Sequence, residues 1–377
     1  MVLFPRQLKD QIESRIGTQK VLVIYGSRRT GKTYLMREIF NGFATGKKLW
    51  INGEDLDIQR RLAERTTKNY QLLFAGIDLL CIDEAQNIPN IGESLKFLID
   101  EVMPITVIAT GSSSFDLSKS TGAPLLGRSY TYHLMPISLG EISLVLSPLE
   151  ILNQHAERMI YGNYPEIFQL SNEREKQEYL TELVQSSLLK DVFQFEGIQN
   201  SRKVQQLLQL IAYQMGSEVS YNELGNTLGL SKNTVERYLD LLEKNFILFS
   251  LRGFGNNERK EVTKKSKWYF YDNGIRNALI GRFEGKNSRT DWGNLFEAMV
   301  IQERQRLNQR NRAWVQYYFW RNYNQQEVDL IEKQGDQILA IESKLTEPKR
   351  VSKAFLSNYP EAIFDIITES NYLEKLK

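Results

Sequence analysis

The most constraining feature of this chain is a glycine-bounded segment near its N-terminus, Gly26–Thr33, which reads GSRRTGKT. It fits the pattern G-x-x-x-x-G-K-[ST] at every fixed position and lies between an apolar run, Val21–Tyr25, and an amphipathic stretch, Tyr34–Phe40. Its glycines let backbone N–H groups surround a phosphate at a helix N-terminus, where the helix dipole favours an anion. Lys32 would place its charge on the β- and γ-phosphates, and the Thr33 hydroxyl would ligate Mg²⁺. The sequence therefore predicts ATP and Mg²⁺ as cofactors, and a glycine turn without a ligand is the alternative. The expected binding residues are Gly26, Ser27, Arg28, Arg29, Thr30, Gly31, Lys32 and Thr33.

Short apolar runs alternate with helix-period segments over residues 1–145, which is typical of an α/β domain with a mostly parallel sheet. The expected strands are Val21–Tyr25, Leu49–Asn52, Leu79–Asp83 and Ile105–Thr110. The third strand ends in two carboxylates: Asp83 would hold the Mg²⁺ shell, and Glu84 would polarise the attacking water as a catalytic residue. After the fourth strand, Thr110 or Ser112 would sense the γ-phosphate. Solvated acids at a strand end and a serine-rich turn without a function are the alternatives.

Arg128 follows this region at a distance along the chain that suits an arginine finger. Such a finger stabilises the charge of the transition state and contributes a factor on the order of 10³ to 10⁵ to hydrolysis. We therefore expect Arg128 to be catalytic, for its own nucleotide or for that of a neighbouring chain. A surface arginine outside the site is the alternative.

Composition narrows the remaining possibilities. The length of 377 residues predicts two or three domains. One cysteine and two histidines exclude an internal disulfide and a Cys/His zinc site, so any metal would have oxygen ligands. No apolar run approaches the roughly 18 residues of a membrane span, and the N-terminus lacks the apolar core of a signal peptide. We therefore expect a cytoplasmic protein that does not bind a membrane.

In the middle of the chain the strand pattern gives way to helical periodicity. Helical periodicity over residues 146–200 predicts a helical lid or linker. Residues 201–285 then follow the helix and hairpin order of a winged helix. The expected elements are Val204–Met215, Ser220–Leu228, Ser231–Asn245, Phe246–Leu251 and Lys267–Tyr271.

Positive charge is concentrated in the last part of the chain, where residues 201–377 carry 27 Lys and Arg against 22 Asp and Glu. A polyanion such as DNA would bind there, through a basic wing that contacts phosphates. The wing residues are Arg252, Arg259, Lys260, Lys264, Lys265, Lys267 and Arg276. A second basic stretch, which would line a groove, contains Arg304, Arg306, Arg310 and Arg312. A solvated loop or a docking surface for the first domain is the alternative for the wing.

Residues 286–377 carry acidic side chains on an expected helix, Trp292–Leu307, and on two successive strands joined by a short turn. The strand segments read EVDL from Glu327 and IESK from Ile341. Glu297 lies on the preceding helix.

This ordered set resembles the PD-(D/E)xK nuclease arrangement. The resemblance implies that Glu297, Asp329 and Glu342 hold Mg²⁺ or Mn²⁺ and that Asp329, Glu342 and Lys344 are catalytic, with Lys344 activating water or stabilising the phosphate. Ser343 departs from the apolar residue usual at its position. A structural ion-pair network is the alternative.

Several segments together resemble a large prokaryotic group of AAA-type ATPases, similar to the archaeal ATPases. They are Tyr25–Thr33, IDEAQ from Ile82, GSSS from Gly111, Gly127-Arg128 and YGNYPE from Tyr161. The resemblance covers nearly the whole chain and implies an α/β fold with four parts. These are an AAA-type P-loop ATPase domain with a parallel sheet over 1–145, a helical lid over 146–200, a winged helix over 201–285, and a restriction-endonuclease-like α/β domain of unknown function over 286–377.

The sequence therefore favours an ATPase that couples its nucleotide state to DNA binding or processing by a nuclease-like C-terminal domain. A nucleotide-dependent signalling or interaction protein of the STAND type, with a catalytically silent C-terminal domain, is the alternative. A transcription regulator that uses the winged helix is a third interpretation. Besides ATP and DNA, the expected partners are a second copy of the chain or another protein.

Overall fold

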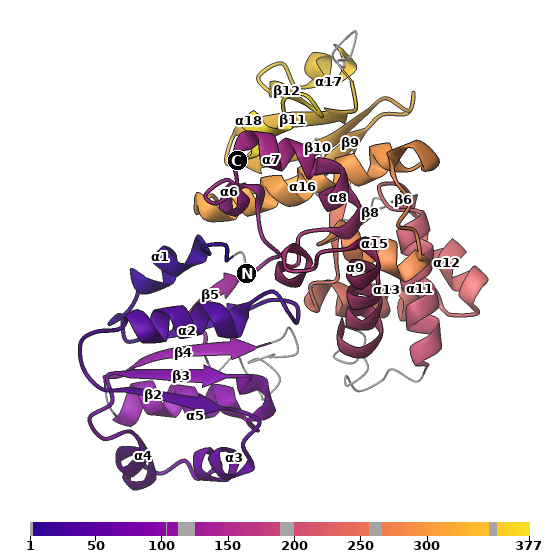
Figure 1. Ribbon diagram of the computed structural model, residues 1–377. Helices are drawn as coiled ribbons and strands as arrows, with labels where there is room; N and C mark the ends of the chain where they lie inside the picture. The colour runs from indigo at the N-terminus through magenta and orange to yellow at the C-terminus, as the bar shows by residue number, and fades with distance from the viewer. Residues whose placement is uncertain (1–2, 103, 112–124, 189–199, 256–265, 347–352) are drawn as a thin grey trace. The chain divides into compact units, whose positions relative to one another are not determined.

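The structure is a computed structural model that describes residues 3–102, 104–111, 125–188, 200–255, 266–346 and 353–377. The chain divides into two compact units (Figure 1). The N-terminal unit is Arg6–Met135, and the second unit is Pro136–Lys377 together with Met1–Pro5. No helix in the described part of the chain is long and apolar enough to cross a membrane.

Within the described residues, the N-terminal unit contains a five-stranded parallel sheet with the strand order β2-β3-β4-β1-β5. Its strands are β1 (Val21–Tyr25), β2 (Lys48–Asn52), β3 (Leu79–Asp83), β4 (Thr106–Gly111) and β5 (Ser129–His133). The four predicted strands are confirmed to within one residue, because their apolar side chains fill both faces of the sheet. The sequence pattern does not predict β5, since this edge strand reads SYTYH and is only half-buried.

Helices cover both faces of this sheet (Figure 1). They are α1 (Leu8–Glu13), α2 (Lys32–Gly42), α3 (Leu56–Ala63), α4 (Thr67–Phe74), η1 (Ala85–Asn87), α5 (Ile91–Phe97) and η2 (Leu98–Val102). Leu22 and Ile24 pack with α1 and α2, whereas Val21 and Val23 pack with α3, α4 and α5. Successive side chains of a strand point to opposite faces, so β1 contributes to two separate cores.

The second unit begins with a run of short helices. These are α6 (Leu139–Ile142), α7 (Pro148–Asn153), α8 (His155–Tyr161), η3 (Pro165–Phe168), α9 (Glu173–Glu182) and η4 (Leu183–Leu188). Ser138 and Ser147 start α6 and α7 with capping boxes, in which serine and glutamate side chains satisfy free backbone N–H groups. The buried side chains of these helices share one core with residues 204–301. In the segment predicted as a lid or linker, the described residues 146–188 are therefore mostly helical and pack within the second unit.

A second sheet follows, which is seven-stranded in the described residues and has the order β12-β11-β10-β9-β7-β8-β6. Its strands are β6 (Glu218–Val219), β7 (Leu248–Gly253), β8 (Ser266–Phe270), β9 (Gln316–Arg321), β10 (Glu327–Gln334), β11 (Gln337–Lys344) and β12 (Ile363–Thr368). The hairpin β7–β8 belongs to the segment predicted as a winged helix, and β9 to β12 belong to the C-terminal segment. The two segments are joined by parallel pairing of β7 with β9 through Arg252–Tyr318 and Gly253–Phe319.

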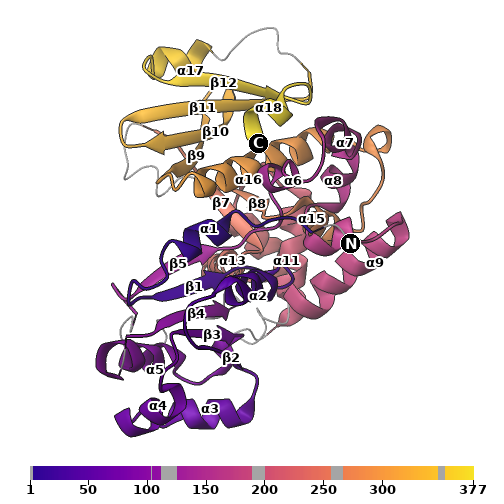
Figure 2. The same cartoon turned by 60° about the vertical axis from the view of Figure 1, so that its left-hand side comes forward.

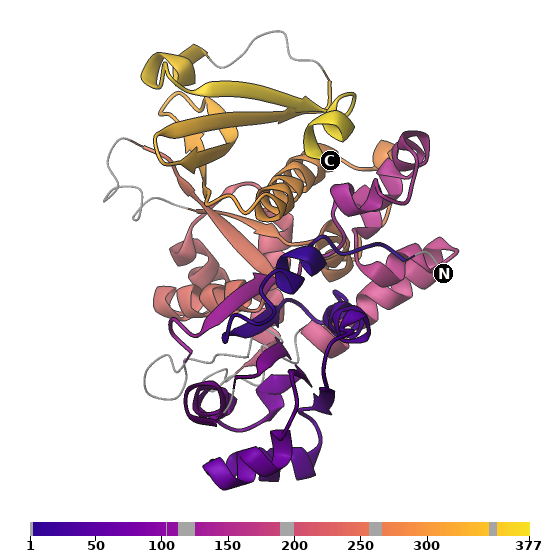
Figure 3. The same cartoon turned by 90° about the vertical axis from the view of Figure 1, so that its left-hand side faces the viewer.

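The helices of this part are α11 (Ser201–Tyr213), α12 (Tyr221–Leu228), α13 (Lys232–Lys244), α15 (Asn273–Ile280), η5 (Lys286–Ser288), α16 (Trp292–Arg310), α17 (Lys353–Asn358) and α18 (Tyr372–Leu376). The long helix α16 runs along the strands β9, β10 and β11 (Figure 2). Figure 3 shows the C-terminal strands, in yellow, on one side of this helix. Helix α16 thereby carries Glu297 against the sheet that holds the other predicted carboxylates.

Candidate functional site

The predicted nucleotide site lies at the carboxyl edge of the sheet in the N-terminal unit. Strands β3, β4 and β1 are neighbours and run parallel, so their last residues meet at one edge. The glycine-bounded loop follows β1, Asp83 and Glu84 follow β3, and Thr110 lies near the end of β4. Ligands of open parallel sheets bind at this edge.

The loop before α2 has a tightly constrained backbone. Gly26 has a φ of +154°, and a Cβ there would lie 2.3 Å from the carbonyl oxygen of Leu134. Gly31 precedes α2 with a φ of +97°, a region that favours glycine. The Lys32 ammonium donates to the carbonyl oxygens of Gly26 (2.8 Å) and Ser27 (2.9 Å), and thus clasps the loop from inside. These contacts give the loop the closed form that a phosphate cradle requires.

A buried arginine supports this loop from outside. The Arg6 guanidinium donates to the carbonyl oxygens of Thr30 (2.7 Å) and Met135 (2.6 Å). The Thr30 hydroxyl donates to the carbonyl oxygen of Ser27 (2.9 Å), across the same turn. The predicted residues Arg28 and Arg29 are half-buried and exposed, respectively, and Arg29 has a φ of +65°. The sequence motif contains no signal for Arg6, because this residue lies far from the loop along the chain.

Two predicted Mg²⁺ ligands are already in contact. The Thr33 hydroxyl donates to Asp83 Oδ1 (3.1 Å), and the Thr110 hydroxyl donates to the same oxygen (2.6 Å). A hydroxyl and a carboxylate are hard oxygen donors of the kind Mg²⁺ prefers beside a nucleotide. The donor set therefore fits Mg²⁺, with Thr33 and Asp83 as the residues that would hold it.

Glu84 lies beside this pair and is held in a defined position. Its backbone has a φ of +50°, and its N–H donates to Thr110 Oγ1 (3.1 Å). Its carboxylate accepts a hydrogen bond from Gln86 Nε2. Thr110 thus connects Asp83 with Glu84. Sequence reasoning names Thr110 only as a sensor and does not assign Gln86, although the segment IDEAQ contains both Glu84 and Gln86.

Two further residues are predicted for this site, Ser112 and Arg128. Ser112 lies outside the described residues. Arg128 immediately precedes β5, and β5 runs parallel to β1, so Arg128 lies at the amino edge of the sheet, opposite the loop. Its guanidinium donates to Asp100 (2.8 Å), and this hydrogen bond raises the pKa of Arg128. The expectation that Arg128 reaches its own nucleotide is therefore wrong for this arrangement, and only a finger for a neighbouring chain remains a prediction.

The carboxylates of the second unit form a cluster that differs in one member from the predicted set. Glu297 of α16 and Glu327 and Asp329 of β10 place ligand oxygens within 4.8 Å of one another. Glu342 is not in this cluster, and its carboxylate pairs with the Lys344 ammonium at 2.8 Å. Sequence reasoning does not nominate Glu327, although the quoted EVDL segment contains it.

Asp329 lies where β10 departs from regular pairing with β9, and β11 holds its carboxylate. The register of β10 against β9 shifts between Val328 and Ile331, so the intervening residues are displaced from regular pairing. Asp329 Oδ2 accepts hydrogen bonds from the backbone N–H (2.8 Å) and the hydroxyl (2.7 Å) of Ser343. The serine that departs from the family pattern thus holds the central carboxylate.

A buried lysine occupies the carboxylate cluster. Lys267 of β8 is 1% exposed, and its ammonium contacts Glu327 and lies 3.5 Å from Glu297 Oε1. Tyr269 donates its hydroxyl to the same oxygen of Glu297 at 2.5 Å. Burial raises the pKa of Glu297 to about 7, with the charge of Asp329 acting in the same direction and Lys267 opposing it. The predicted wing residue Lys267 therefore faces the protein interior.

Other predicted basic side chains are also engaged within the second unit. Arg276 donates to Asp291 at 2.5 Å, Arg304 makes two hydrogen bonds to Glu332, and Arg306 donates to Glu303. Arg276, Arg304 and Arg306 therefore do not form the predicted basic surface, because each is paired with a buried or partly buried acid. The wing residues Arg259, Lys260, Lys264 and Lys265 lie outside the described residues.

Family models match three parts of the chain. Residues 18–143 match a model described as an AAA domain. Residues 152–286 match a domain of unknown function, DUF8612, and residues 292–370 match another, DUF4143.

Uncharacterized proteins of several organisms are similar over most of the chain. One from Methanocaldococcus jannaschii is 26% identical, covering 95% of this chain and 82% of the relative. One from Haemophilus influenzae is 23% identical, covering 88% and 84%, and one from Mycobacterium tuberculosis is 24% identical, covering 95% and 77%.

Solved structures show a distant likeness. The Orc1 protein of Aeropyrum pernix in complex with DNA has a TM-score of 0.36 at 13% identity, covering 74% of this chain and 93% of that one. A STAND protein with a tetratricopeptide repeat sensor from Pyrococcus horikoshii has a TM-score of 0.27 at 14% identity, covering 81% and 46%. At these scores the likeness carries no inference about this chain. The parallel sheet and the loop geometry agree with the match of residues 18–143 to the AAA domain model, the class of domain that the sequence predicts.

Proposed function

We propose that the N-terminal unit binds ATP with Mg²⁺ and hydrolyses it. The observation that carries this proposal is the contact of Thr33 with Asp83 beside a loop that Lys32 clasps from within. The loop N–H groups and Lys32 would hold the β- and γ-phosphates, and Thr33 and Asp83 would hold the metal ion. Bound Mg²⁺ would neutralise charge that develops on the phosphates.

Glu84 completes this proposal as the residue that orients the attacking water or accepts its proton. A positioned general base contributes a factor of about 10² to 10⁴ to a rate. The hydrogen bonds from Glu84 N–H to Thr110 and from Gln86 to the carboxylate support this role, because they fix both ends of the residue.

Phosphate release from Mg-ATP tests the proposal. Lys32→Ala should abolish nucleotide binding in calorimetry. Glu84→Gln should keep nucleotide binding but lower turnover by at least about 10²-fold, because the base is lost while the cradle is intact. Lys96→Ala, at an exposed position of α5, is the matched lysine control and should change neither quantity. Equal turnover by the wild type and Glu84→Gln would refute the assignment of Glu84.

For the second unit, we propose a binding role controlled by the nucleotide, with no cleavage activity of its own. This is the signalling or interaction alternative of the STAND type. The support is that the carboxylate cluster contains an internal ammonium and that Arg276, Arg304 and Arg306 are paired with internal acids. A surface that binds DNA by charge needs cations that are free to replace condensed counterions.

DNA binding and processing is the competing proposal. It is supported by the winged-helix order of α11, β6, α12, α13, β7 and β8. Fluorescence anisotropy with a labelled duplex at low and physiological salt separates the two. We expect no binding at low salt, whereas affinity that falls steeply with salt would favour DNA. DNA cleavage in Mg²⁺ or Mn²⁺ that is lost in Asp329→Ala would refute the proposal that the second unit has no cleavage activity.

A further inference from the structure

The ammonium of Lys267 lies where a metal ion would have to bind in the carboxylate cluster. Lys267 comes from β8, Glu297 from α16, and Glu327 and Asp329 from β10, so the cluster connects three elements. The Lys267 side chain is 2% exposed and contacts Glu327 while lying 3.5 Å from Glu297. A cation is therefore already present, and it is covalently attached to the chain.

The carboxylate oxygens have further partners besides this ammonium. Glu297 Oε1 accepts the hydroxyl of Tyr269 at 2.5 Å. Asp329 Oδ2 accepts both the N–H and the hydroxyl of Ser343. These hydrogen bonds satisfy part of the acceptor capacity of the carboxylates, so a divalent ion would have to share the ligand oxygens with them and replace the ammonium of Lys267.

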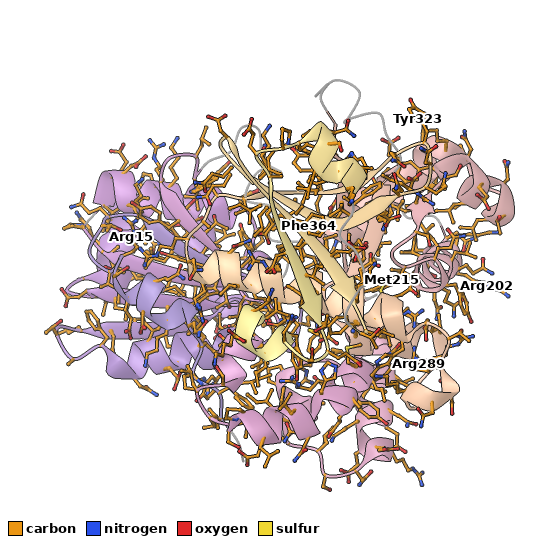
Figure 4. The ribbon with its side chains drawn as sticks, turned by 90° about the horizontal axis from the view of Figure 1, so that it is seen from above. Arg15, Arg202, Met215, Arg289, Tyr323 and Phe364 are labelled. Carbon is orange, nitrogen blue, oxygen red and sulfur yellow. The ribbon has the colours of Figure 1, made fainter. Side chains whose placement is uncertain are left out.

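A second cation lies beside the cluster. An open cavity of about 700 Å³ is lined by Glu218, Phe319, Arg321 and Tyr323, among others. Tyr323 is fully exposed beside it and points outward (Figure 4). Arg321 Nε lies 3.6 Å from Glu327 Oε2. The guanidinium of Arg321 therefore adds a second positive charge beside the cluster.

We propose that Lys267 is the built-in cation of this cluster and excludes a divalent metal ion, so that the predicted metal ligands serve as an ion-pair hub joining β8, α16 and β10. The metal implied by the nuclease-like resemblance does not fit the site. The charge balance supports this, because Lys267 already neutralises part of the charge that would attract the ion. The proposal is independent of nucleotide hydrolysis in the N-terminal unit.

Mn²⁺ titration of the full chain, followed by electron paramagnetic resonance without nucleotide, tests the proposal. All variants carry Asp83→Asn, which silences the expected metal position of the N-terminal unit. We expect Mn²⁺ binding by this parent to be the same with and without Asp329→Asn, because the cluster binds no Mn²⁺. Adding Lys267→Met should create one site per chain, at least ten-fold tighter than any remaining binding, because three carboxylates are left without their ammonium.

The control lysine is Lys286, which pairs with Glu369 outside the cluster and is about half exposed. Lys286→Met should create no site, and Asp329→Asn should remove the site created by Lys267→Met. Stoichiometric Mn²⁺ binding by the parent, lost in Asp329→Asn, would overturn the proposal. The Mn²⁺ titration of the parent uses an intact cluster. It therefore tests the proposal even if Lys267→Met fails to fold. ATP binding is measured separately with Asp83 intact, so failure of the nucleotide proposal would be seen independently.

Discussion

At the scale of single residues, Thr110 connects the two acidic residues of the proposed nucleotide site. Its buried hydroxyl donates to Asp83 and accepts the N–H of Glu84, whose backbone lies in the left-handed region. Thr110→Val keeps the shape of the side chain but removes both hydrogen bonds. We expect ATP turnover to fall about ten-fold or more while the fold is retained, because an unpaired buried N–H costs about 1–3 kcal/mol and frees Glu84. Steady-state phosphate release measures this effect.

Thr106, on the same strand, provides the matched control. Its hydroxyl accepts the N–H of Gly17 at 3.0 Å, at the opposite end of β4. Thr106→Val therefore removes a comparable hydrogen bond far from the loop and should lower thermal stability without changing turnover. Equal turnover in the two variants would show that Thr110 acts on the fold and not on the site.

The residues of the two sites differ in how well the sequence predicts them. The loop residues, Asp83 and Glu84 follow from the sequence, because each belongs to a short motif: a glycine-bounded turn, or an apolar strand that ends in two carboxylates. Arg6 and Lys267 do not, and their partners lie 24 and 60 residues away. Neither residue has a local pattern, so only the folded arrangement reveals what each one contacts.

At the scale of elements, Asp291 connects α15 with the start of α16. It accepts hydrogen bonds from Arg276 and Arg289, whose side chains are 3% and 1% exposed. Burial alone would raise the pKa of Asp291, but the hydrogen bonds from Arg289 and Arg276 hold it well below its ordinary value of 3.8. Asp291→Asn should lower the free energy of unfolding at pH 7 by about 3–5 kcal/mol, because two buried guanidinium groups lose their counterion.

This cost should depend on pH with a definite sign. A depressed carboxyl pKa adds stability above the ordinary pKa and loses it as the pH falls toward the folded value. The difference between wild type and Asp291→Asn should therefore be constant above about pH 5 and shrink below about pH 4. Urea unfolding at pH 7 and pH 3.5 measures it. Asp100→Asn, which breaks the more exposed pair with Arg128, should leave the free energy of unfolding nearly unchanged. A difference that grows toward acid would contradict the assignment.

Elements also differ in how well their sequences define them. Strands β1 and β3 match the predicted bounds residue for residue, since each is a short apolar run that is buried on both faces. The pairing of β7 with β9 has no such signal. This pairing joins Arg252 to Tyr318, and α15 and α16 lie between them in the sequence. The sequence therefore predicts two separate segments, 201–285 and 286–377, whereas the folded chain has one continuous sheet.

At the scale of the whole molecule, this sheet predicts that residues 201–377 lose structure together. Phe319 is 2% exposed on β9, its carbonyl oxygen accepts the N–H of Phe254 (2.7 Å), and the Lys267 ammonium lies over its ring. Phe319→Ala should cost about 3–5 kcal/mol. Strands β8 and β11 both lie two strands from β9, on opposite sides. Native-state hydrogen exchange should therefore accelerate in both strands by similar factors.

The control for this prediction is a second phenylalanine, Phe364, on the edge strand β12 (Figure 4). It is only partly buried, so Phe364→Ala should cost less and should accelerate exchange in β11 and β12 while leaving β8 unchanged. Acceleration confined to β10 and β11 in Phe319→Ala would show that the hairpin β7–β8 folds independently. In that case the boundary at residue 286 would separate two folding units, and the ion pair between Lys267 and Glu327 would be a contact between domains, not part of a shared core.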